Sequence, residues 1–143
     1  MIKFIILSLL FVAQVSFASG DSGKGATADA HNFFPPKNAD SSKVARPGQI
    51  ELVEPAYHAS ITGDTTTLRW KASEGAEVYH VQVATDPNFK WLVSNVTTHQ
   101  GTSFEVKGLE KGKNYWWRVA GRKLDNEPLY TKGWFAVSTF ETK

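Results

Sequence analysis

A run of alternating large side chains near the C-terminal end is the feature that most limits how this chain can fold. Within residues 114–122, Tyr115, Trp117 and Val119 stand at every second position. Every second side chain of an extended strand points to the same face of a sheet, so this spacing predicts a strand with one buried face. Trp116 then points to the opposite face.

Short apolar alternations separated by turn residues continue from residue 48 to the end of the chain, the pattern of an all-β sandwich. Residues 48–143 are therefore expected to form one domain of seven strands, and no stretch after residue 18 shows a helical period. The expected strands are Gln49–Val53, Thr66–Lys71, Tyr79–Ala84, Leu92–Thr98, Ser103–Val106, Asn114–Arg122 and Val137–Thr142.

Residues 1–18 have the layout of a secretory signal peptide. Lys3 supplies a positive charge, an apolar run extends to Val15, and small residues precede an expected cleavage point after Ala18. The apolar run is shorter than the roughly 20 residues of a stable membrane-spanning helix. We therefore expect an exported protein, periplasmic or extracellular, without a stable membrane span after cleavage; an uncleaved anchor is the alternative.

Residues 19–47 are rich in Gly, Ala, Ser and polar side chains and have no apolar period, which predicts a disordered linker. Phe33 and Phe34, followed by two prolines, interrupt this segment. They are a candidate docking motif for a partner protein. A contact with the edge of the domain and a chance occurrence are the alternatives.

Composition excludes several classes of function. The chain has no cysteine, so disulfides and thiolate metal sites are ruled out. The formal net charge is only +2 with both signs interspersed, which gives no electrostatic footprint for nucleic acid. The four histidines lack the close spacing of metal ligands, and no nucleophile motif or phosphate-binding loop is present. We expect neither an enzyme nor a cofactor.

Four segments in this order and spacing resemble a fibronectin type III domain of the kind found in exported bacterial proteins. They are Leu68-Arg69-Trp70, Tyr79 to Phe89, Leu109 to Val119, and the closing strand Ser138 to Thr142. The resemblance implies an immunoglobulin-like sandwich in which the ring of Tyr115 is buried and its hydroxyl bonds back to the upstream backbone. The expected core includes Trp70, Tyr79, Leu109, Tyr115, Trp117 and Phe140.

Two departures from related domains limit what the resemblance implies. The loop Lys123–Gly133 contains no Arg-Gly-Asp, so integrin adhesion is not implied. Phe135 follows Trp134 where related domains often have Trp-Ser, so cytokine-receptor recognition is not implied either. What remains is a binding or spacer module, because the fold itself fixes no ligand.

The outward aromatic residues Trp116 and Trp91 are the candidate contacts, since exposed Trp is enriched at binding hot spots. Alternatively, Arg118 covers Trp116, and Trp91 lies under the loop that follows it. Two functions stay open. One is a protein-binding or scaffolding module of the cell envelope that uses the face around Trp116, the loop Lys123–Gly133 and the linker. The other is a carbohydrate- or cell-wall-binding domain in which Trp91 or Trp116 stacks on sugar rings.

Overall fold

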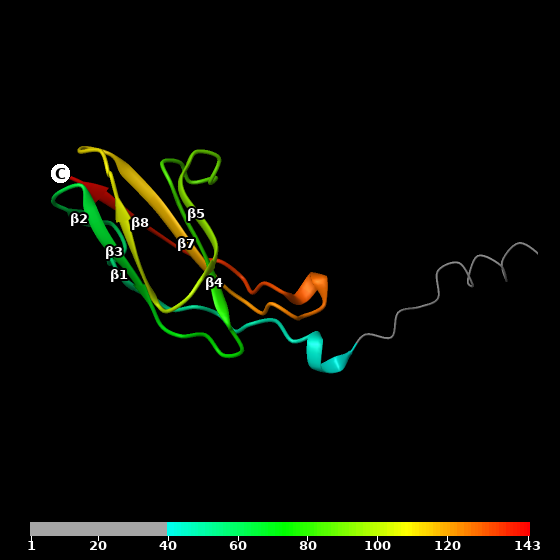
Figure 1. Ribbon diagram of the computed structural model, residues 1–143. Coiled ribbons are helices and arrows are strands. Elements are labelled where there is room, and N and C mark those ends of the chain that lie inside the picture. The colour runs from blue at the N-terminus through cyan, green and yellow to red at the C-terminus, as the bar shows by residue number, and fades with distance from the viewer. Residues whose placement is uncertain (1–39) are drawn as a thin grey trace, which may run out of the picture. The chain divides into compact units, whose positions relative to one another are not determined.

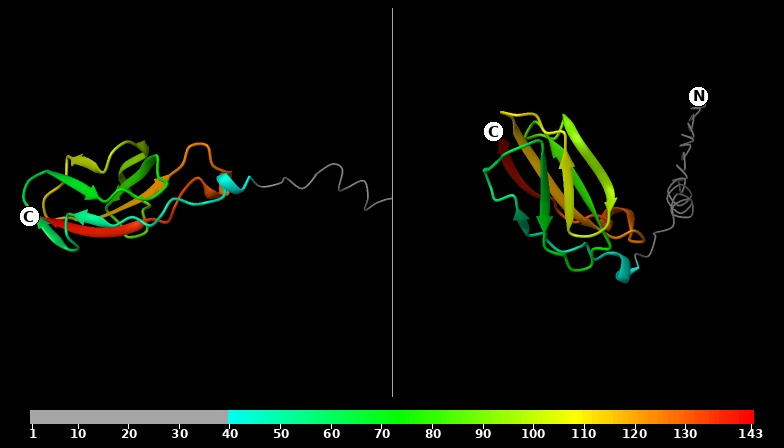
Figure 2. Two further views of the ribbon diagram at one scale, coloured as in Figure 1. Left: turned by 90° about the horizontal axis from the view of Figure 1, so that it is seen from below. Right: turned by 60° about the vertical axis from the view of Figure 1, so that its left-hand side comes forward.

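Two β-sheets packed face to face form the body of residues 40–143, the part of the chain that the computed structural model describes (Figures 1 and 2). The smaller sheet has the order β1-β3-β6 and consists of β1 (Leu52–Glu54), β3 (Thr65–Trp70) and β6 (Ser103–Lys107). The larger sheet has the order β2-β8-β7-β4-β5 and consists of β2 (Ala59–Ile61), β8 (Ala136–Thr142), β7 (Asn114–Arg122), β4 (Val78–Ala84) and β5 (Leu92–His99). The predicted all-β sandwich is confirmed.

The core lies between the sheets and follows the alternation of the sequence. β3 contributes Leu68 and Trp70, and β7 contributes Tyr115, Trp117 and Val119. All of these side chains are buried because each lies on the face of its strand that meets the other sheet. The six side chains assigned to the core from sequence are all buried: Trp70, Tyr79, Leu109, Tyr115, Trp117 and Phe140.

A tyrosine corner fixes how the chain enters β7. The Tyr115 hydroxyl accepts a hydrogen bond of 2.8 Å from the backbone N–H of Glu110, and the Tyr115 ring stacks on Phe140 of β8 with 5.4 Å between ring centroids. Leu109, just before Glu110, is buried in the same core. The corner therefore ties the incoming loop to β7 and β8, two inner strands of the larger sheet.

The prediction of seven strands was wrong, because the described residues contain eight. The additional strand is β2, which has three residues and pairs in parallel with the end of β8, from Ala59 beside Phe140 to Ile61 beside Thr142. A strand of three residues is too short to show an alternation of its own. Its partner lies about 80 residues further along the chain, so no local turn signal marks the pairing.

Residues 40–47 also differ from the prediction, which placed them in the linker. Asp40 caps the short 3-10 helix η1 (Ser41–Lys43), and Pro47 is buried against the domain. Polar sequence alone does not reveal that this segment packs on a distant loop. The predicted signal peptide, residues 19–39 of the predicted linker, and its residues Phe33 and Phe34 lie outside the described residues.

Candidate interaction surfaces

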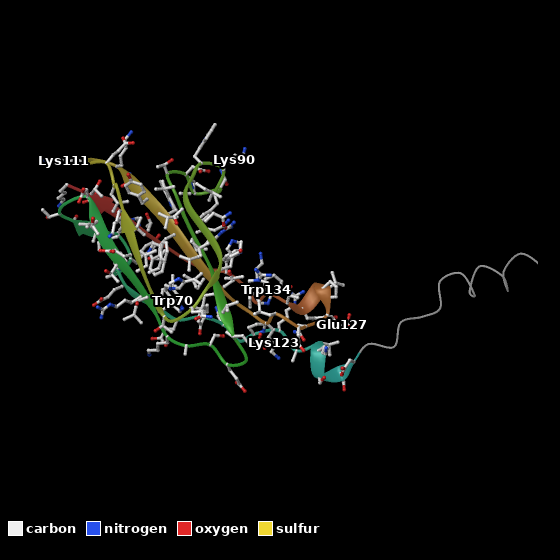
Figure 3. All side chains as sticks on the ribbon, viewed as in Figure 1. Trp70, Lys90, Lys111, Lys123, Glu127 and Trp134 are labelled. Atoms are coloured by element: carbon white, nitrogen blue, oxygen red, sulfur yellow. The ribbon has the colours of Figure 1, made fainter. Side chains whose placement is uncertain are left out.

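Three large apolar side chains project from the connection between β7 and β8. Leu124, Leu129 and Trp134 are 59%, 76% and 71% exposed, and together they are called the apolar tip. The connection contains a second 3-10 helix, η2 (Pro128–Tyr130), and forms one end of the domain, where Figure 3 labels Trp134. Large apolar side chains that are exposed on one connection are candidates for contact with another molecule.

The loop that carries the apolar tip is held by its own backbone. The N–H of Lys123 donates to the carbonyl of Thr131 at 2.8 Å, and the N–H of Gly133 donates to the carbonyl of Gly121 at 2.9 Å. The Asn126 side chain donates to the carbonyl of Tyr130 at 2.7 Å. The two backbone bonds pair the strands of the loop at and just beyond the end of β7, and the Asn126 side chain closes its tip, so the exposed side chains are presented on a fixed support.

Residues 40–47, called the strap, hold the loop from outside. The backbone N–H of Glu127 donates to the carbonyl of Lys43 at 3.0 Å, and the Asn126 side chain donates to the carbonyl of Ala45 at 2.9 Å. The Arg46 guanidinium lies 5.2 Å from the Trp134 ring centroid and 5.4 Å from that of Tyr130. One face of the Trp134 indole is thus contacted by a cation, while most of its surface stays open.

The strap and the loop approach closely at Gly133. A Cβ atom at this position would lie 2.8 Å from the carbonyl oxygen of Pro47, closer than side chains tolerate. Only glycine lets the two backbones pass at this distance. η1 and η2 consequently lie side by side at the same end of the domain (Figure 1).

The outer face of the larger sheet carries a stack built on Arg118. Its guanidinium lies 4.0 Å from the ring centroid of Phe89 and 4.1 Å from that of Phe135. Its Nε donates to the Gln82 side chain at 2.7 Å. Partial burial in this stack lowers the pKa of Arg118. Lys132 covers Phe135, with 4.5 Å from its Nζ to the ring centroid. These partners leave little of the stack free for a ligand.

Trp116 lies on this face, as its position in β7 requires, but it is half-buried. Its neighbours in register are Ala84 of β4 and Thr139 of β8, and both small side chains are buried although they face outward. Small side chains on an outer face are buried only when larger neighbours cover them. Because Trp116 is half-buried among these neighbours, it is not an open platform for a ligand. The Arg118 guanidinium stacks on Phe89 and Phe135.

Trp91 is 73% exposed and lies in the connection between β4 and β5. The Asp86 carboxylate organises this turn by accepting backbone N–H groups of Trp91 at 2.7 Å, Asn88 at 3.1 Å and Lys90 at 3.2 Å. These bonds, above all that from Trp91, lower the pKa of Asp86. Ala84 pairs with Trp116 near the start of β7, so the turn that carries Trp91 is at the opposite end of the domain from the apolar tip; Figure 3 labels Lys90 of this turn and, at the other end, Trp134.

The histidine side chains of the described part form contacts within the domain. His80 Nε2 lies 2.9 Å from the Asn95 side-chain oxygen, and the His80 ring contacts Phe135 at 5.2 Å. Burial lowers the pKa of His80, and the cations Lys132, Arg122 and Arg118 lower it further. Within residues 40–143, no three His, Asp or Glu side chains gather closely enough to hold a metal ion.

Trp134, Leu124 and Leu129 were not among the candidate residues chosen from sequence, although the loop Lys123–Gly133 was. The sequence signal for them is weak, since none of the three lies in a predicted strand whose alternation would assign a face. Of these candidates, the structure leaves Trp91 open and half-buries Trp116; both lie at the same end of the larger sheet, since Ala84 is in register with Trp116 and with Leu92. The two tryptophans do not form one surface with the apolar tip.

The strand order of the two sheets and the Tyr115 corner make the described part a fibronectin type III-like domain. No protein-family model and no curated protein matches the chain. Among solved structures, it is similar to an Fn3-like protein from Clostridium thermocellum, with 19% identity over 71% of this chain and 95% of that chain, and a TM-score of 0.46.

It is also similar to FN3tt, with 19% identity over 68% of this chain and 94% of that chain and a TM-score of 0.45. A redesigned β-sandwich protein gives 20% identity over 68% of this chain and 93% of that chain, with a TM-score of 0.49. These similarities concern the fold and carry no ligand over to this chain. In residues 40–143, no helix is long and apolar enough to cross a membrane.

Proposed function

We propose that this protein is a non-catalytic binding or scaffolding module of the cell envelope or the extracellular space, and that it binds another protein through the apolar tip. The observation that carries the proposal is the grouping of Leu124, Leu129 and Trp134 on one loop, each more than half exposed. Export rests on the sequence of residues 1–18. Nucleic acid, cofactors and metals have no part in this function.

The composition of the apolar tip favours a protein as the partner. Trp and Arg are the residue types that most often dominate binding energy at protein interfaces, and Arg46 lies over the Trp134 ring. A sugar site uses a flat aromatic ring bordered by polar groups, whereas two leucines and a tryptophan exposed on one connection offer more apolar area to a protein. Because the strap and the ladder already fix the loop, binding costs little ordering of the backbone.

The test begins with capture of partners from the native envelope by the exported protein, followed by an affinity measurement with the purified partner. Trp134→Ala is expected to weaken binding at least tenfold, or about 1.4 kcal/mol. Trp91→Ala is the matched control, because it removes an indole of nearly equal exposure, 73% against 71%, from the other end of the domain. Equal affinity of wild type and Trp134→Ala would contradict the proposal.

A second candidate function, carbohydrate or cell-wall binding, is favoured by one observation at Trp91. This indole is open to solvent, and the turn that carries it also presents the polar residues Asn88 and Lys90. Retardation of the protein in gels that contain cell-wall polysaccharide measures such binding. Loss of retardation in Trp91→Ala, with retention in Trp134→Ala, would assign the function to this turn instead.

A further inference from the structure

The two sheets of the described part expose four edge strands to solvent, and these edges are very different. β1 and β6 border the smaller sheet, and β2 and β5 border the larger one. An edge strand presents backbone N–H and C=O groups that have no partner within the sheet. Soluble proteins normally protect such edges by making them short or by placing charges on them.

Three of the four edges carry this protection. β1 and β2 have three residues each, and Glu54 at the end of β1 pairs with Arg69 at 3.5 Å. β6 carries Glu105 and Lys107, which form an ion pair of 2.9 Å along the strand. A second strand that approached any of these edges would meet a charge or a ladder too short to continue.

β5 is neither short nor charged, although its ladder with β4 is irregular at two places, opposite Tyr79–Val81 and opposite Val83–Ala84. It has eight residues, and residues 91–104, which include it, contain no Asp, Glu, Lys, Arg or Pro. At its start Leu92 and Val93 are exposed beside Trp91. Arg122 of β7, in the same sheet, donates from its Nη1 to the carbonyl of Thr97 at 2.9 Å. Among the four edge strands of residues 40–143, β5 is therefore the longest, and its protection consists of bulges and not of charges or short length.

We propose that β5 pairs antiparallel with β5 of a second copy of this chain, which joins two five-stranded sheets into one continuous sheet. A second copy fits this edge because a twofold axis presents the same uncharged strand, with the same twist, to itself. Antiparallel pairing brings Leu92 and Val93 of one copy toward Thr97 and Thr98 of the other. Apolar and β-branched neighbours of this kind are favourable cross-strand pairs.

The turn at Trp91 and the apolar tip remain outside this pairing. Both lie beyond the ends of the ladder, one before Leu92 and the other in the connection after β7. The dimer would therefore present two apolar tips and leave the proposed protein-binding surface open in each copy.

The test is sedimentation equilibrium of the exported protein from about 1 µM to about 1 mM, a range that detects weak as well as moderate association. Wild type is expected to change from monomer to dimer within it. Val93→Lys places a charge on the β5 edge and is expected to raise the dimer dissociation constant at least tenfold. Val53→Lys is the matched control, since Val53 is 46% exposed on the edge strand β1 and Val93 is 43% exposed on β5.

Hydrogen exchange gives a second measurement. Amide exchange in residues 92–99 is expected to slow as the protein concentration rises, and the thermal midpoint of each variant shows that it is folded. A protein that stays monomeric at about 1 mM would overturn the inference. So would a dimer that Val93→Lys leaves intact, or one that Trp134→Ala dissociates.

Discussion

Removal of a single oxygen at Tyr115 tests whether the corner stabilises the domain. Tyr115→Phe keeps the buried ring, which stacks on Phe140, and deletes the hydroxyl that accepts the 2.8 Å hydrogen bond from Glu110. The side-chain hydrogen bond from Thr139 to the Tyr115 carbonyl is untouched. The substitution therefore isolates one hydrogen bond from the packing around it.

The expected loss of unfolding free energy is about 1 kcal/mol. One intramolecular hydrogen bond contributes roughly 0.5–1.5 kcal/mol net, and a fully buried N–H left without a partner costs more. Glu110 is exposed, so water can reach its N–H in the variant and the loss stays near the middle of that range. For a domain of about 100 residues, this corresponds to a fall in Tm of roughly 5 °C.

Urea and thermal denaturation of wild type and variant measure the loss. Tyr57→Phe is the control, because the Tyr57 side chain is exposed and its ring contacts only the adjacent His58 among the ring contacts of the described residues. The control is expected to stay within about 0.5 kcal/mol of wild type. If Tyr115→Phe were as stable as the control, the corner would be a geometric feature without energetic consequence.

Three further outcomes are expected. Trp117→Ala should lower the unfolding free energy measured in urea by about 3–5 kcal/mol, and Trp116→Ala should lower it by less, because only Trp117 is fully buried. A larger loss in Trp116→Ala would mean that the register of β7 is shifted by one residue. The pKa of His80 lies below that of an unfolded histidine, near 6.5, so protonation favours the unfolded state and stability should fall as pH drops below about 6.5. His80→Gln should reduce the difference between the urea midpoints measured at about pH 7.5 and about pH 5.5. If the variant shows the same difference as wild type, groups other than His80 cause the pH dependence. Intact mass of the exported protein should show Ser19 as the first residue, and a start beyond about residue 25 would refute the cleavage point.

The strands that build the core could be predicted from sequence because their own residues carry the signal. In β3 and β7 the alternation of large and polar side chains is set by which face meets the other sheet. The corner was predictable for a similar reason, since Leu109, Gly112 and Tyr115 lie close together in the chain. Local patterns of this kind determine both the fold class and the inward face.

The candidate surfaces depend on contacts between distant segments, which a single sequence does not show. Trp116 is half-buried, and the guanidinium of Arg118, also on the outer face of β7, is occupied by Phe89 from one loop and Phe135 from another. The strap packs on a loop about 80 residues away, as the bond from Asn126 to Ala45 shows. The polar residues of this segment show no periodicity from which such packing could be predicted.

The parallel pairing of β2 with β8 determines how the domain responds to mechanical load. β2 follows the N-terminal end of the described chain and β8 ends one residue before Lys143. In Figure 1 the C-terminus and η1 lie at opposite ends of the domain. When the two ends are pulled apart and the tension reaches β2, the parallel strands β2 and β8 are therefore pulled in opposite directions along their length. The hydrogen bonds between them are loaded together in shear, instead of being opened one at a time as in a zipper.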